Sequence, residues 1–169
     1  WVKAALSARK PVVTANKALI ALHGQELLQL ASEHRIPLLF EAAVAGGVPI
    51  VKTLAEGIAA NQVNWVAGII NGTANYILTE MLANRDFSAV LEEAQALGYA
   101  EVDPSFDVAG IDAAHKLTIL ASLAFGLPLQ FDQVYVEGIT ELQPQDLLYA
   151  DELGYRLKHL GIAKKQASG

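Results

Sequence analysis

Hydrophobic and polar positions follow two different periods along the chain, and these periods predict an alternating order of helices and strands. In residues 17–35, Leu19, Leu22, Leu27, Leu28, Leu30 and Ala31 recur at the spacing of a helix. The same helical spacing is found in 1–10, 48–61, 73–85, 87–98, 107–126 and 145–161. Short apolar runs ended by Pro, Asn or Gly predict strands in 11–17, 36–47, 62–72 and 130–140, and a further strand begins at 162–165. Alternation of this kind predicts an α/β or α+β fold.

Composition limits the class of protein. The chain has 169 residues, of which 53% are hydrophobic, and its mean hydropathy is +0.31, so it can bury one domain core and still offer apolar surface to a partner. No apolar run reaches the roughly 20 residues that span a bilayer, and no cysteine is present. The net charge of -6 argues against binding to a phosphate backbone. We therefore expect a cytoplasmic protein that binds neither membrane nor nucleic acid.

Ionisable residues gather in one short stretch, LGYAEVDPSFDVAGIDAAHKL, at 97–117. On a helix over 107–125, Asp112 and Lys116 lie four residues apart and face the same way, with His115 beside them. Because the helix is apolar on most other sides, we expect these groups to be partly buried, and buried charges persist when they are paired or used.

Simpler interpretations of the same stretch stay open. Asp112 and Lys116 can form an ordinary helix ion pair, Asp107 can cap the helix, and His115 can be a half-buried residue without a chemical role. Glu101 and Asp103 can belong to a turn before Pro104.

Two further stretches have candidate chemistry. In FEAAVAGGVP, small residues after Glu41 leave the backbone free to turn its carbonyls inward, which suits a hard cation with oxygen ligands. The alternative is a close-packed turn at Gly46 and Gly47. In NGTANY, Thr73 can be the N-cap of a helix or a contact to substrate or cofactor.

The stretch from Ala94 to Lys116 resembles the signature of homoserine dehydrogenases, in which eight positions recur at fixed spacing: Ala94, Gly98, Asp103, Pro104, Asp107, Gly110, Asp112 and Lys116. The likeness continues in TANKALIALHGQELLQLA, FEAAVAGGVPIV and GIINGTANYILTEM. This resemblance implies a mixed sheet with helices packed on one face. It also implies the interconversion of homoserine and aspartate 4-semialdehyde with NAD or NADP, on the route to threonine, isoleucine and methionine, in a homodimer.

The resemblance also assigns roles to residues. Glu101 and Asp112 would hold the substrate, Lys116 would move the proton, and Asp107 would be a supporting acid at the catalytic site. Lys17 and Gly98 would lie at the cofactor. Main-chain oxygens would bind a monovalent cation, sodium, at Glu41, Val44, Gly46 and Val48.

The chain contains no G-x-G-x-x-G turn of the kind that grips a dinucleotide, and it starts at Trp1 within helix-like sequence. The resemblance places that turn ahead of this segment, which implies that residues 1–17 are a remnant of a nucleotide-binding domain that is otherwise mostly missing. Residues 18–169 would form a substrate-binding, catalytic and dimerisation domain that is incomplete at its C-terminus. Two interpretations of different class remain: the catalytic portion of a homoserine dehydrogenase, expected to be inactive alone, or a module used only for substrate binding and dimerisation. A different NAD(P)-linked oxidoreductase that shares the fold is a third.

Overall fold

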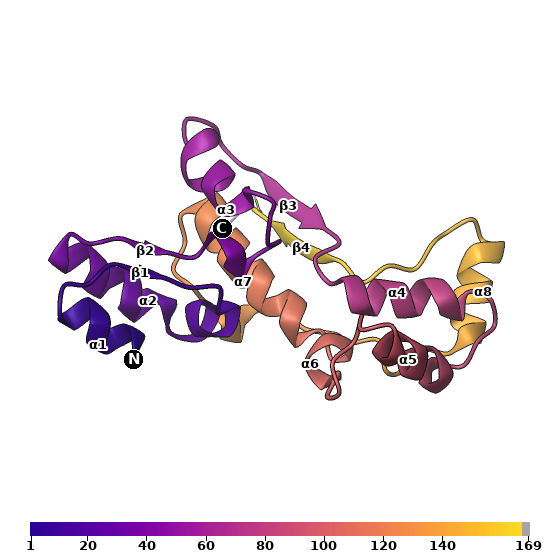
Figure 1. The fold of residues 1–169 in the computed structure, drawn as a ribbon. Helices are drawn as coiled ribbons and strands as arrows, with labels where there is room; N and C mark the ends of the chain where they lie inside the picture. The colour runs from indigo at the N-terminus through magenta and orange to yellow at the C-terminus, as the bar shows by residue number, and fades with distance from the viewer. Residues whose placement is uncertain (167–169) are drawn as a thin grey trace. The chain divides into compact units, whose positions relative to one another are not determined.

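The structure, a computed structural model, describes residues 1–166, and these residues divide into two compact units. Unit 1 contains residues 1–66, 115–134 and the chain from 162 onward, and unit 2 contains residues 67–114 and 135–161. Figure 1 shows the order of the elements along the chain.

Unit 1 is built around a long helix beside a small parallel sheet. Its elements are α1 (Val2–Ser7), β1 (Val12–Val13), α2 (Lys17–His34), β2 (Leu38–Leu39), η1 (Glu41–Ala43), α3 (Ile50–Lys52) and the π-helical turn η2 (Thr53–Gly57). Strands β1 and β2 pair in parallel, with Val12 opposite Leu38. Helix α2 begins where Asn16 Oδ1 accepts a hydrogen bond from Leu19 N at 2.9 Å. The predicted helix over 17–35 is thus confirmed.

Unit 2 is a helical cluster that comprises α4 (Gly72–Met81), α5 (Phe87–Ala96), α6 (Ser105–Val108) and α8 (Pro144–Glu152). Helix α4 packs against the other three (Figure 1). Its buried residues Ile77, Leu78 and Met81 belong to the hydrophobic core of the unit. Val90 of α5 and Leu147 of α8 complete that core from the neighbouring helices. Burying these side chains provides the main driving force for holding the four helices together.

Three elements lie at or across the division of the chain. Helix α7 (Ile111–Phe125) begins in unit 2 and continues in unit 1, where η3 (Phe131–Gln133) follows it. Strand β3 (Trp65–Gly68) pairs with β4 (Gly161–Lys164), so the predicted strand start at 162–165 is confirmed. The expected α/β class is also confirmed, although the strands are short and form two separate pairs.

Three predicted elements differ from the structure. The helix predicted over 107–126 is broken at Gly110, whose left-handed φ of 80° ends α6 before α7 begins. The helix predicted over 145–161 stops at Glu152, and the chain continues without regular structure to β4. The strand predicted over 130–140 was wrong: within the described residues this segment contains η3 and then an extended stretch outside any ladder.

The physical reason for the missing strand lies in the backbone partners of residues 138–139. Ile139 N donates to Val108 O at 2.8 Å, so this backbone is paired with α6 and not with a strand. Gly138 lies so close to Val108 O that a Cβ built on it would be 2.4 Å from that oxygen. Ile139, one of the apolar residues on which the strand prediction rested, is indeed buried, at 2% exposed. Its burial is against helices and not in a sheet.

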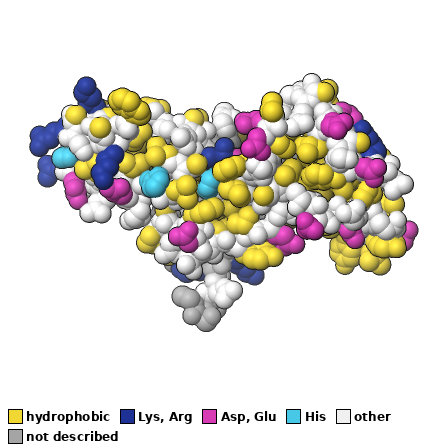
Figure 2. Space-filling view, turned by 90° about the horizontal axis from the view of Figure 1, so that it is seen from below, with side chains coloured by type: hydrophobic (Ala, Val, Ile, Leu, Met, Phe, Trp, Pro, Cys, Tyr) yellow, Lys and Arg dark blue, Asp and Glu magenta, His cyan; other side chains and the backbone are white. Residues whose placement is uncertain are grey.

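Along the described part of the chain, every helix falls short of the length and apolarity that crossing a bilayer demands. Hydrophobic side chains nevertheless remain visible on the surface in Figure 2. The exposed ones include Val13 and Leu39 of the β1–β2 sheet in unit 1, and Tyr149 and Leu153 of the α8 region in unit 2.

Candidate functional site

The amide side chain of Asn71 joins two aspartates in unit 2. Its Nδ2 donates to Asp107 Oδ1 at 2.7 Å and to Asp112 Oδ2 at 3.0 Å. Asn71 and Asp112 are buried, at 2% and 6% exposed, and Asp107 is half-buried. Because both carboxylates contact the same nitrogen, they are close neighbours. Such a pair gives the site a negative charge that suits a cationic ligand group.

The break at Gly110 makes this arrangement possible. Asp107 lies on α6, whereas Asp112 lies in the first turn of α7, and Gly110 redirects the chain between them. The alternative interpretation of Asp107 as the cap of the long helix is contradicted, since Asp107 is the third residue of α6. The expected burial of Asp112 is confirmed.

Asn71 has a second role as the N-cap of α4. Its Oδ1 accepts from Ala74 N at 2.7 Å, so the amide group orients the helix start and the two carboxylates at once. Of the two roles left open for Thr73, that of N-cap is contradicted, because the cap is Asn71. Asn before Gly-Thr at the start of a helical period is the cap signal that indicates it. The Thr73 hydroxyl instead donates to Tyr99 O at 2.6 Å.

An open pocket of about 480 Å³ adjoins the start of α4. It is lined by Gly72, Thr73, Tyr76, Gly98 and Tyr99. Gly98 follows the end of α5 with a φ of 75°, as the predicted helix end requires, and a Cβ there would meet no atom within 4 Å. Space is therefore available at Gly98 for close approach of a ligand. Tyr76 and Tyr99 were not predicted as pocket residues.

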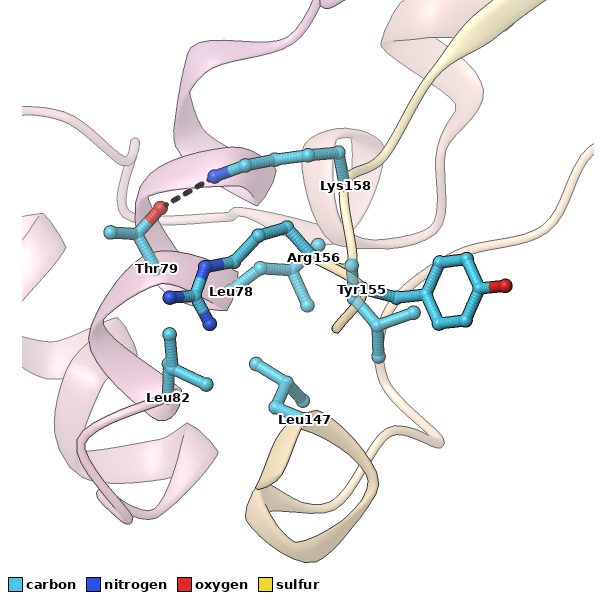
Figure 3. Close-up of a pocket in the computed structure, with 8 residues that line it drawn as sticks. Leu78, Thr79, Leu82, Leu147, Tyr155, Arg156 and Lys158 are labelled. Carbon is cyan, nitrogen blue, oxygen red and sulfur yellow. Dashed lines mark hydrogen bonds between the residues drawn. The ribbon is translucent and has the colours of Figure 1, made fainter. Parts of the chain in front are cut away.

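A smaller pocket lies elsewhere in unit 2, between α4 and the segment after α8. Figure 3 shows Leu78 and Leu82 of α4 facing Leu147 of α8, with Lys158 reaching Thr79. The bond from Lys158 Nζ to Thr79 Oγ1 is 3.0 Å. This smaller pocket has a volume of about 40 Å³, enough for little more than a water molecule. The pocket at Tyr99 is therefore the better candidate for a metabolite.

Glu101 and Asp103 lie on the exposed segment before α6. Asp103 Oδ1 accepts from Ser105 N at 3.1 Å, and hydrogen bonds from Ser105 lower the pKa of Asp103. The turn interpretation of Asp103 is thus confirmed. The main-chain O of Glu101 accepts from Gln95 Nε2, near the end of α5, at 3.0 Å. Glu101 itself is exposed.

Unit 1 contains the second group of predicted residues. His115 is 2% exposed and packs on Phe131, with ring centroids 4.7 Å apart and an interplanar angle of 47°. His115 is thus fully buried, where the alternative interpretation of the sequence had a half-buried residue. Lys116 follows it on α7 and is half-buried. Lys17 is the first residue of α2, directly after the Asn16 cap, and is also half-buried.

The loop after β2 contains the four residues expected to bind a cation. The side chain of Glu41 extends from this loop to α3, where Oε1 accepts from Val51 N and Oε2 from Lys52 N, each at 2.9 Å. That carboxylate therefore fastens the start of α3 to the loop. Within this loop, between Val44 and Gly46, Ala45 adopts a left-handed φ of 49°, which turns the backbone sharply. Residues 1–166 hold no cluster of three His, Cys, Asp or Glu side chains suited to a metal ion.

Known proteins similar to this chain in sequence and in structure include several homoserine dehydrogenases. The chain is 64% identical to the homoserine dehydrogenase of Pseudomonas aeruginosa over 161 residues, which cover 95% of this chain and 37% of that protein. A homoserine dehydrogenase from Thiobacillus denitrificans superposes with a TM-score of 0.96 at 56% identity, over 99% of this chain and 39% of that one. A hyperthermophilic archaeal homoserine dehydrogenase in complex with NADPH has a TM-score of 0.80 at 32% identity, over 97% and 48% of the two chains.

These solved relatives have the same fold as this chain, which is of the α/β class. The family model for homoserine dehydrogenase matches residues 49–168, and the chain belongs to the homoserine dehydrogenase family. The chain spans somewhat over a third of the length of the curated relatives named here, at 37% of the Pseudomonas protein.

Proposed function

We propose that this chain supplies the substrate-binding and proton-transfer residues of an NAD(P)-dependent homoserine dehydrogenase. The observation that carries the proposal is the carboxylate pair on Asn71, the residue directly before Gly72 of the open pocket, in a member of this family. Homoserine carries an α-ammonium group, which carboxylates attract. In the proposed roles, Asp112 and Glu101 bind the substrate, and Asp107 supports Asp112 through their shared amide.

Lys116 is the proposed proton carrier. When homoserine is oxidised, the lysine amine takes the hydroxyl proton; in the reverse direction its ammonium returns a proton to the aldehyde oxygen. A bound nicotinamide cofactor supplies or accepts the hydride at the carbon. An ammonium at this oxygen also stabilises the alkoxide that forms as the bond orders change.

Lys17 and Gly98 are the proposed contacts to NAD or NADP. The open space at Gly98 supports its part, since a ligand could approach the backbone there. The proposed division of the complete protein places residues 1–17 in a nucleotide-binding domain and 18–169 in the substrate-binding, catalytic and dimerisation domain. The archaeal relative crystallised with NADPH is consistent with a nicotinamide cofactor.

A sodium ion at the loop after β2 is part of the proposal. The proposed ligands are the main-chain oxygens of Glu41, Val44, Gly46 and Val48. Oxygen ligands fit a hard monovalent cation. Two of these oxygens also accept backbone hydrogen bonds, Glu41 O from Val44 N at 3.4 Å and Val48 O from Ile50 N at 2.7 Å. Glu41 would reinforce this loop through its bonds to the start of α3.

The complete protein would act in the cytoplasm, as a homodimer, in the biosynthesis of threonine, isoleucine and methionine. The exposed apolar side chains support a partner surface. The net charge of -6 supports the absence of nucleic-acid binding.

The test is an assay of the full-length protein with L-homoserine and with NAD and NADP separately. Cofactor reduction that depends on homoserine is the expected result, and its absence with both cofactors would overturn the proposal. The alternative function is an inactive substrate-binding and dimerisation module. Since the 169-residue chain lacks the Gly-rich turn, we expect it to bind NADPH weakly, and micromolar binding in a titration would contradict this.

A further inference from the structure

A series of contacts in unit 2 leads from a half-buried ion-pair group to the aromatic wall of the pocket. Arg85 donates through Nη1 to Glu80 Oε2 at 2.8 Å and through Nη2 to Glu93 Oε2. The hydroxyl of Tyr76 donates to the other oxygen of that carboxylate, Glu93 Oε1, at 3.1 Å. The carboxylate of Glu93 therefore bonds Arg85 through one oxygen and Tyr76 through the other.

Tyr76 in turn packs against Tyr99. Their ring centroids lie 5.0 Å apart with an interplanar angle of 67°, the edge-to-face geometry that aromatic pairs prefer. Both residues line the pocket. The backbone of Tyr99 is fixed separately, because its O accepts from Thr73 Oγ1 at 2.6 Å and its N donates to Ala94 O at 2.8 Å. With the backbone held in this way, the contact with Tyr76 acts on the side-chain rotamer of Tyr99, which sets where its ring lies.

The charges along this series keep each group in the form that the contacts need. Arg85 lowers the pKa of Glu93, and the bond from Tyr76 lowers it further, so Glu93 stays an acceptor. Burial, together with the bond to Glu93, raises the pKa of Tyr76, so its hydroxyl stays a donor. The hydrogen bond between them persists across the neutral pH range.

We propose that Glu93 is a positioning residue, which acts through Tyr76 to hold the Tyr99 ring in the pocket and thereby sets the affinity for the substrate. Tyr99 is 57% exposed, so without this contact its side chain would sample other rotamers. A ligand would then have to order that ring on binding, which weakens affinity. The identity of the ligand, homoserine, rests on the proposed function.

Steady-state kinetics of the full-length protein give the first test. Tyr76→Phe removes the hydroxyl and keeps the ring, and Glu93→Gln removes the charge that pairs with Arg85. Each is expected to raise KM for homoserine about threefold to tenfold, the effect of one hydrogen bond of ordinary net strength, with kcat within about twofold. Tyr135→Phe is the matched control, because the Tyr135 hydroxyl also bonds a glutamate, Glu137, at 3.0 Å.

The second test follows the Tyr99 ring directly and needs no activity. In full-length protein labelled with fluorotyrosine, the Tyr99 signal is assigned by its loss in Tyr99→Phe. We expect Glu93→Gln to shift and broaden this signal, whereas Glu92→Gln, at an exposed neighbour on α5, leaves it in place.

The two tests separate the two proposals. An unmoved Tyr99 signal in Glu93→Gln overturns the positioning role, and so does a fall in kcat with unchanged KM. If the wild-type protein oxidises no homoserine, the proposed function fails, and the Tyr99 signal alone decides whether Glu93 positions the ring.

Discussion

The side chain of Asn75 pairs with the backbone of His159 as one strand residue pairs with another. Asn75 Nδ2 donates to His159 O at 2.9 Å, and His159 N donates to Asn75 Oδ1 at 3.0 Å. The same Nδ2 donates to Asn71 O within α4. A single buried amide therefore fastens the irregular segment before β4 to the helix that begins at the candidate site.

Removing this amide is expected to destabilise unit 2. Asn75→Ala leaves the N–H and C=O of His159 without their partner in a part-buried position, which costs about 2–3 kcal/mol of unfolding free energy. Urea denaturation measures the change. Asn64→Ala at an exposed position is the control and is expected to stay within about 0.5 kcal/mol of wild type. A loss of that small size in Asn75→Ala would show that water replaces the amide.

Gly110 and Gly154 separate backbone strain from steric clash. Both have a left-handed φ, of 80° and 81°. A Cβ at Gly110 would lie 2.8 Å from Glu137 O, whereas none of the surrounding atoms comes within 4 Å at Gly154. We expect Gly154→Ala to cost about 1 kcal/mol and Gly110→Ala at least about 3 kcal/mol, measured by thermal or urea unfolding. Equal costs would mean that the chain around residue 137 yields without penalty.

Lys116→Ala tests the proposed proton transfer in the full-length protein. Turnover of homoserine is expected to fall at least about 10²-fold, the usual effect of losing a positioned acid or base, with nearly unchanged folding and cofactor binding. Lys52→Ala, at an exposed lysine that faces Glu56, is the control and should keep its rate. If Lys116 were only half of a helix ion pair, its loss would leave the rate unchanged and cost under about 1 kcal/mol of stability.

Acid sensitivity is expected to depend on Glu93. Arg85 foremost, and then Tyr76, lower the pKa of Glu93 below its ordinary value of 4.5. The ionised carboxylate therefore stabilises the fold above that pH, and this contribution is lost as the pH falls from about 4.5 through the lowered pKa. In Glu93→Gln, Tm at neutral pH should drop, and its further decrease below pH 4.5 should be shallower than in wild type.

Thermal unfolding by circular dichroism across this pH range provides the measurement. Glu92→Gln is expected to follow the wild-type profile, since Glu92 is exposed on the same helix. Parallel profiles for wild type and Glu93→Gln would contradict the role of the ion pair.

Local signals predicted the parts of this fold that are determined locally. Helix α2 was predicted from its apolar period alone, and the Asn16 cap that starts it lies directly before that period. The predicted strand over 130–140 failed because Ile139 is buried against Val108, a partner far along the chain. An apolar pattern indicates burial, but it does not say which backbone completes the hydrogen bonds.

The candidate site shows the same limit. Burial of Asp112 could be predicted from the apolar helix around it, and the family resemblance singled out Asp107 and Asp112 together. The amide that joins them could not be predicted, because Asn71 lies 36 and 41 residues away from its two partners. The roles of Lys17, Lys116 and the cation loop stay predictions.

Asn71 is followed by Gly72, and an asparagine before glycine is the pair most prone to spontaneous deamidation. Conversion of this one amide to a carboxylate would remove both donors and set a third negative charge against Asp107 and Asp112. The same change would disturb the start of α4, since the cap on Ala74 N depends on that side chain. Burial of Asn71 and the hydrogen bonds of its amide restrict the motion that deamidation requires. The lifetime of the site in an ageing protein therefore depends on the integrity of this single side chain, which peptide mapping of stored protein can follow.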